Sequence, residues 1–179
     1  VADLSPMMQH YLQVKNEYPD CIIFYRLGDF YEMFFEDAKV VSKELELTLT
    51  GKQAGLSEKI PMCGVPHHAV NVYLEKLIEK GYKVAICEQL EDPKETKGMV
   101  KRDVVQVVTK GTRMDSTIDS KSNNYIANIY DFSYCYGIGY ADISTGDINS
   151  MLLTDLDSLY RELINRNIKE VIVNSEIDR

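Results

Sequence analysis

A turn that follows an apolar run constrains the fold of this chain more than any other feature of its sequence. The run leads directly into the segment RLGDFYE at residues 26–32. Gly28 can adopt the positive φ values closed to residues with a Cβ, and Asp29 can bond to nearby backbone N–H groups. The pair therefore predicts a sharp exit from a strand. After such a turn Phe30 and Glu32 can project from a surface, although composition alone favours a core position for Phe30.

Three further segments follow this turn in a fixed order. They are IPMCGVPHHA at residues 60–69, AICEQ at residues 85–89 and DP at residues 92–93. Each string is a weak motif by itself, whereas the four together, at this separation, are very hard to obtain by chance. With them, the chain closely resembles the N-terminal region of the MutS family of DNA mismatch-repair proteins. The resemblance extends from about Pro6 to the last residue.

The resemblance implies a domain organisation. Residues 1–109 would form an α+β mismatch-recognition domain, a mixed sheet with flanking helices. Residues 110–124 would be a linker, because they are polar and contain few sizeable apolar side chains. Residues 125–179 would form the first part of an α/β connector domain with a ribonuclease-H-like fold.

The resemblance also implies a mechanism. In such proteins the ring at the position of Phe30 wedges into the duplex beside a mispaired base, and the carboxylate at the position of Glu32 hydrogen-bonds that base. Inserting a ring from the minor groove costs a few kcal/mol of unstacking in an intact duplex, and less where the pair is already mismatched or unpaired. Discrimination would then come from the deformability of the DNA, without a sequence code.

Four other residues are assigned to the same site. Gly28 and Asp29 would support the turn. The segment of Met62 would lie beside the minor groove, with a gap-filling core position as the alternative. Lys52 occupies a position where relatives usually carry arginine, and a lysine can still meet phosphate as a point charge without the bidentate fork.

The charge of the chain argues against strong DNA binding on its own. The formal net charge is −8, and residues 1–109 carry 13 basic and 17 acidic side chains. Counterion release from phosphates supplies most nonspecific affinity, and an acidic chain lacks that driving force. We therefore expect it to read DNA that other domains of a longer, dimeric protein hold in place. The expected partners are double-stranded DNA with mismatches or small unpaired loops and a MutL-type protein.

No enzymatic role is expected of the chain itself. The sequence contains no Gly-x-x-x-x-Gly-Lys-Ser/Thr loop, so ATP and Mg²⁺ would belong to other domains of the full-length protein. Two alternatives stay open. Asp142 and Asp147 could hold the metal ions of a nuclease, although both are more simply explained as turn residues, and the connector half could mainly dock a partner protein. Metal binding by the adjacent His67 and His68 is not expected, because neighbours on a regular element cannot both face one ion.

Composition indicates a cytoplasmic protein. No apolar run approaches the ~20 residues that cross a bilayer, and the first residues lack the features of a signal peptide. The cysteines are widely spaced in apolar surroundings, so reduced and buried thiols are expected; they are Cys21, Cys63, Cys87 and Cys135.

Local patterns predict the regular elements. The expected helices are residues 6–17, 35–45, 70–80 and 156–165. The expected strands are residues 21–27, 47–50, 83–89, 103–109, 125–130, 134–142, 147–153 and 170–174. Residues 51–59 are expected to form a loop.

Overall fold

The chain forms two compact units, Val1–Thr109 and Lys110–Arg179. The structure, a computed structural model, describes residues 4–91, 98, 100–112 and 123–174. Most of the predicted linker, residues 113–122, lies outside the described residues. Within the described residues, no helix has the length and apolar character needed to span a membrane.

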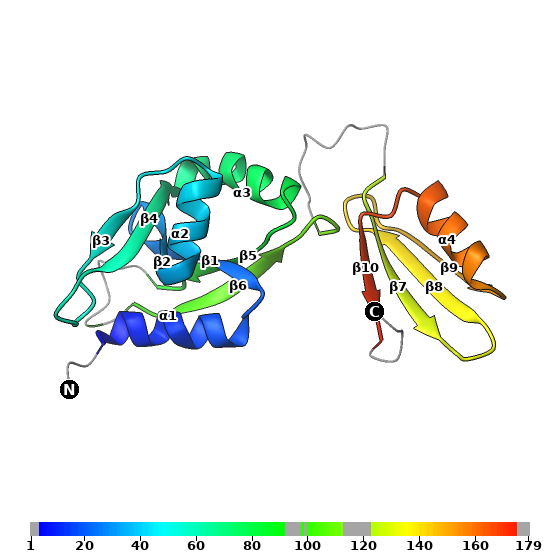
Figure 1. Ribbon diagram of the computed structural model, residues 1–179, viewed down its shortest axis with the longest axis horizontal. Helices are drawn as coiled ribbons and strands as arrows, with labels where there is room; N and C mark the ends of the chain where they lie inside the picture. The colour runs from blue at the N-terminus through cyan, green and yellow to red at the C-terminus, as the bar shows by residue number, and fades with distance from the viewer. Residues whose placement is uncertain (1–3, 92–97, 99, 113–122, 175–179) are drawn as a thin grey trace. The chain divides into compact units, whose positions relative to one another are not determined.

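The first unit is built on a six-stranded mixed sheet with the order β3-β4-β2-β1-β5-β6 (Figure 1). Its strands are β1 (Cys21–Leu27), β2 (Phe30–Phe34), β3 (Thr50–Lys52), β4 (Ile60–Pro66), β5 (Lys83–Gln89) and β6 (Arg102–Val108). Strand β1 runs parallel to β5, and every other neighbouring pair is antiparallel. The first five residues of β1 are all buried. A central strand that is covered on both faces explains this uninterrupted apolar run.

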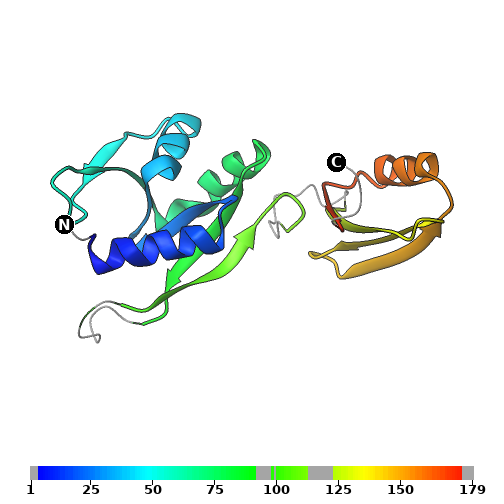
Figure 2. The same ribbon diagram turned by 60° about the horizontal axis from the view of Figure 1, so that its bottom comes forward.

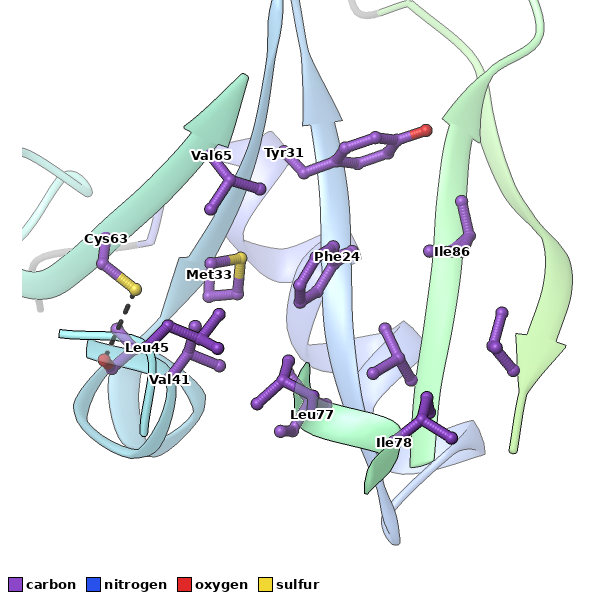
Figure 3. Packing of buried hydrophobic residues seen from close by; sticks show 14 residues of the cluster. Phe24, Tyr31, Met33, Val41, Leu45, Cys63, Val65, Leu77, Ile78 and Ile86 are labelled. Atoms are coloured by element: carbon purple, nitrogen blue, oxygen red, sulfur yellow. Dashed lines mark hydrogen bonds between the residues drawn. The ribbon is translucent and has the colours of Figure 1, made fainter. Parts of the chain in front are cut away.

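Helices cover both faces of this sheet (Figures 1 and 2). They are α1 (Pro6–Glu17), α2 (Phe35–Glu44) and α3 (Val70–Glu79), and the 3₁₀ turn η1 (His67–Ala69) precedes α3. Because side chains alternate along β1, Ile22 and Phe24 pack with α2 and α3, whereas Ile23 and Tyr25 pack with α1. Figure 3 shows the first of these clusters, in which Phe24 lies among side chains of the sheet and of both helices.

A buried carboxylate ties the helices to the sheet. Asp37 Oδ2 accepts hydrogen bonds from the Tyr11 hydroxyl (3.1 Å) and from the backbone N–H of Ile23 (2.9 Å). Asp37 Oδ1 accepts from Lys15 Nζ at 2.9 Å. The residue lies in the first turn of α2, where the helix dipole favours a negative charge. One side chain thus joins α1, β1 and α2.

The second unit contains a four-stranded sheet with the order β10-β7-β8-β9. Its elements are β7 (Tyr125–Asp131), β8 (Tyr136–Asp142), β9 (Asp147–Leu153), α4 (Leu156–Asn165) and β10 (Glu170–Val173). Strands β7 to β9 form the predicted antiparallel meander, and β10 pairs in parallel with β7. The Asp155 side chain caps α4 by accepting from the N–H of Ser158 at 2.7 Å. Leu159 of α4 packs on the sheet.

The predicted fold class is confirmed, because both units are sheets with flanking helices. All four predicted helices are present within one residue of their expected ends. The prediction of a strand over residues 47–50 is wrong. Glu46 adopts a φ of 55°, and the N–H of Leu47 bonds to the carbonyl of Ser42 at 2.9 Å, so these residues close the C-terminus of α2 in a Schellman-type cap. The strand that follows, β3, starts at Thr50 and takes in part of the predicted loop.

The cysteine prediction holds at three positions. Cys21, Cys63 and Cys87 are buried, whereas Cys135 is only partly buried because it lies in the turn between β7 and β8. Burial raises the pKa of both the Cys63 and the Cys87 thiol to about 12.

Removing the buried carboxylate should destabilise the first unit. Asp37→Ala leaves the Tyr11 hydroxyl, the N–H of Ile23 and the Lys15 ammonium without their partner, so we expect a loss of about 3 kcal/mol in the free energy of unfolding. Chemical denaturation of the chain measures it. Glu36→Ala is the matched control, because Glu36 lies in the same helical turn with an exposed side chain and should change stability by less than about 0.5 kcal/mol. Equal losses in both variants would contradict the role of Asp37.

Thiol reactivity should follow burial. At pH 8 the thiolate fraction of Cys63 and Cys87 is on the order of 10⁻⁴, and both side chains are shielded from solvent. Iodoacetamide should therefore label Cys135 first, as measured by peptide mass spectrometry, and should reach the other two only after unfolding. Labelling of Cys63 or Cys87 as fast as Cys135 in the native chain would show that the core is open.

Candidate nucleic-acid interface

The predicted turn is a two-residue hairpin between β1 and β2. Leu27 pairs with Phe30 across it, and Gly28 and Asp29 form the loop. Gly28 has a φ of 57°, in the left-handed region, and occupies the first loop position, where two-residue hairpins need a positive φ. The sequence prediction of a positive φ at this residue is confirmed.

Two other elements, and one side chain of β1 itself, hold this hairpin. The N–H of Gly28 donates to Gln89 Oε1 of β5 at 3.0 Å, and the carbonyl of Gly28 accepts from Arg26 Nε at 2.5 Å. The N–H of His67 donates to the carbonyl of Asp29 at 2.9 Å. Gln89 and His67 both belong to motifs that carry the family resemblance, yet sequence reasoning gave neither of them this role. The bonds join positions that are far apart in the sequence, and no local pattern signals them.

Phe30 lies on the surface at the start of β2. Its side chain is 47% exposed, whereas the next residue, Tyr31, is buried beneath α2 and α3. The alternative of a core position for Phe30 is therefore wrong. Because side chains alternate along a strand, Glu32 points to the same face as Phe30, which is the face that carries α1.

Glu32 and Lys52 form an ion pair. Lys52 Nζ donates to Glu32 Oε2, and the same ammonium lies 5.4 Å from the centroid of the Phe34 ring. Gly64 of β4 lies opposite Glu32, and a Cβ there would come within 3.5 Å of Glu32 Cγ. The sequence predicted that Lys52 contacts a DNA phosphate, and did not predict its contact with Glu32.

Met62 lies on the same face of the sheet, in strand β4. It is partly buried, packs against the α1 cluster and pairs with Phe34 and Thr50 on the two neighbouring strands. The Thr50 hydroxyl donates to the Met62 carbonyl at 3.1 Å and lies 3.6 Å from its sulfur. The structure thus brings Phe30, Glu32, Lys52 and Met62 onto one surface, although they come from three strands.

The two carboxylates considered for a nuclease site lie at either end of the turn between β8 and β9. Asp142 is buried and accepts from the N–H of Asn124 (3.0 Å), and from the N–H (2.9 Å) and hydroxyl (2.6 Å) of Ser144. The hydroxyl bond lowers the pKa of Asp142 below its ordinary value. Asp147 accepts from the Tyr125 hydroxyl at 2.6 Å. Asp142 therefore holds the turn, whereas Asp147 ties β9 to β7, and no group of three potential metal ligands occurs among the described residues.

Comparison with known proteins assigns the chain to a family. The model for MutS domain I matches residues 5–117, and the model for MutS domain II matches residues 124–179. The chain belongs to the MutS family. It is 54% identical over 179 residues to the DNA mismatch repair protein MutS of Staphylococcus haemolyticus, covering 99% of this chain and 20% of the relative. Identity is 54% with the protein of that name from Acetivibrio thermocellus, over 98% of this chain and 21% of the relative.

A third relative, the DNA mismatch repair protein MutS of Bacillus subtilis, is 50% identical over 99% of this chain and 21% of its own length. The chain thus spans about a fifth of the length of the curated relatives it matches. The comparisons match the chain to the first two domains of MutS. They assign no role to individual surface residues, so those roles are inferred from the geometry.

Substitution of Gly28 should show what the hairpin requires. A Cβ at this position meets no atom within 4 Å, so Gly28→Ala introduces backbone strain without a clash and should cost about 1 kcal/mol of unfolding free energy. Gly28→Asn should cost less, because asparagine tolerates the left-handed region. Thermal or chemical unfolding of the two variants side by side measures the difference, and an asparagine variant no more stable than the alanine variant would contradict this account.

Proposed function

We propose that this chain recognises mismatched or unpaired bases in double-stranded DNA. Phe30 enters the minor groove and stacks beside the base, and Glu32 forms a hydrogen bond with it. The observation that carries the proposal is a half-exposed aromatic ring at a firmly held hairpin, with a carboxylate two residues later on the same face. Membership of the MutS family supports it, because the three relatives described above are named for DNA mismatch repair.

The energetics of wedging suit such a surface. Stacking on an aromatic ring returns ~1–3 kcal/mol per base whatever the base is. The cost of opening the stack is a few kcal/mol, and it falls where pairing is already lost. A ring that is presented without reorganisation of the protein therefore favours the deformable site. The bonds from Gln89 and His67 to the hairpin provide this preorganisation.

Basic side chains neutralise two carboxylates near Phe30. Lys52 pairs with Glu32, and Arg26 lies 3.7 Å from the Glu88 carboxylate. With a net charge of −8, the chain offers little attraction for phosphates, so the proposal requires the remaining four fifths of a full-length MutS protein to hold the duplex. The same proposal assigns ATP, Mg²⁺ and homodimer formation to that remainder, and contact with a MutL-type protein to the second unit.

Truncation of Phe30 tests the proposal. In a full-length MutS protein that carries this segment, Phe30→Ala should lower affinity for G·T or unpaired-T duplexes by about 5- to 100-fold, towards the affinity for homoduplex, because the stacking return is lost. Binding is measured by fluorescence anisotropy with both kinds of duplex.

Phe132→Ala is the matched control, since Phe132 is similarly exposed at 43% but lies in the second unit. It should leave DNA affinity unchanged. Thermal unfolding is compared as well, because an exposed Phe30 should cost little stability on truncation. Full mismatch preference in Phe30→Ala, or unfolding of the variant, would refute the proposal.

A further inference from the structure

The partner of the Glu32 carboxylate is fixed by sheet pairing. Lys52 is the last residue of β3, where it pairs with Ile60 of β4, and β4 in turn pairs with β2. This places Lys52 two strands away from Glu32, on the same face. The side chains of Lys52 and Glu32 are only 29% and 17% exposed. The ion pair is therefore packed into the sheet surface. Two fully exposed, mobile side chains that met by chance would not be buried to this extent.

Two contacts restrain the lysine. Its ammonium donates to Glu32 Oε2 and also lies over the Phe34 ring, which is on the same face two residues further along β2. Cation–π attraction and the ion pair act on the same group, so the ammonium has two anchors on β2. Gly64 belongs to β4, the strand between Lys52 and Glu32, and it has no side chain that would stand between them; a Cβ there would lie 3.5 Å from Glu32 Cγ. The lysine can therefore reach across β4 to the carboxylate.

We propose that Lys52 is a positioning residue that aims and neutralises Glu32 for base recognition, a role that rests on the function proposed above. The lysine occupies Oε2, and Oε1 has no hydrogen-bond partner among the described residues. Oε1 is thereby left to face the base. The lysine also cancels a negative charge that the phosphates on both sides of a minor groove would repel.

This role differs from direct phosphate binding in what it predicts. A lysine that contacts phosphate strengthens binding to every duplex by the same factor, and its loss lowers the salt dependence by a slope of ~0.9. A lysine that acts through Glu32 changes the preference for mismatched DNA, and does so only when the carboxylate is present. The two roles can therefore be separated by measuring two duplexes in two backgrounds.

A double-mutant cycle makes the measurement. Lys52→Met, Glu32→Gln and the double variant are prepared in a full-length MutS protein that carries this segment. Affinities for homoduplex and unpaired-T duplex are determined at several salt concentrations. Lys52→Met should lower the ratio of mismatch to homoduplex affinity by about fivefold or more in the Glu32 background, and by less than about twofold in the Glu32→Gln background. Lys52→Arg should keep the ratio, because a guanidinium still donates to the carboxylate.

Equal effects of Lys52→Met on both duplexes and in both backgrounds, with the salt slope reduced by ~0.9, would overturn the inference in favour of a phosphate contact. A Lys52→Met variant with unchanged preference would overturn it too. Phe30→Ala in the same assay separates this failure from that of the proposed function. If Phe30→Ala abolishes mismatch preference and the cycle shows no coupling, only the role of Lys52 is wrong. If Phe30→Ala has no effect, the proposed function itself fails.

Discussion

Strand β1 is the element on which the arrangement of the first unit depends. It is paired on both edges, in parallel with β5 and antiparallel with β2, and its first five residues are buried against helices on both faces. Backbone groups in such a position have no access to water, so the ladders on both edges must be complete. The strand cannot shift by one residue without moving Ile23 and Tyr25 into the opposite apolar cluster. Its end, and with it the hairpin at Gly28, therefore has a fixed place.

The surface proposed for mismatch recognition inherits its geometry from this register. Leu27 opposite Phe30 and Tyr25 opposite Glu32 define which face each residue of β2 presents. Tyr31 and Met33 are buried on the opposite face and anchor β2 in the core, so the strand stays in place although Phe30 itself is exposed. Under the proposed function, the backbone that carries the ring is already in place before DNA arrives. Insertion then costs little conformational entropy. The loss of this entropy is what usually weakens binding by flexible loops.

Sequence reasoning succeeded where the decisive interaction is local. The apolar run of β1, the positive φ of Gly28 and the helical spacing of α1 and α3 are each encoded within a few neighbouring residues, and the structure confirms them. It failed at β2 and β4, which were not predicted. Strand β4 contains Pro61, Gly64 and Pro66, residues that argue against a strand when read singly. The ion pair between Lys52 and Glu32 could not be predicted from the sequence for a related reason. It depends on the register of β2 with β4 and on the register of β3 with β4.

The balance of charge at this surface would allow an acidic chain to approach a polyanion, as the proposed function requires. A lone Glu32 near phosphates would oppose binding to every duplex, and a lone Lys52 would favour binding to every duplex. Neither residue alone would distinguish mismatched DNA from homoduplex. Joined, they leave a nearly neutral surface whose remaining oxygen can bond only to a donor brought within reach. An intact, stacked pair resists the widening that brings a base edge to that oxygen, whereas a mispaired base does not. Under the proposed function, preference then arises from the energy of deforming the DNA, and the protein needs no net attraction for the phosphates at the site where it reads the base.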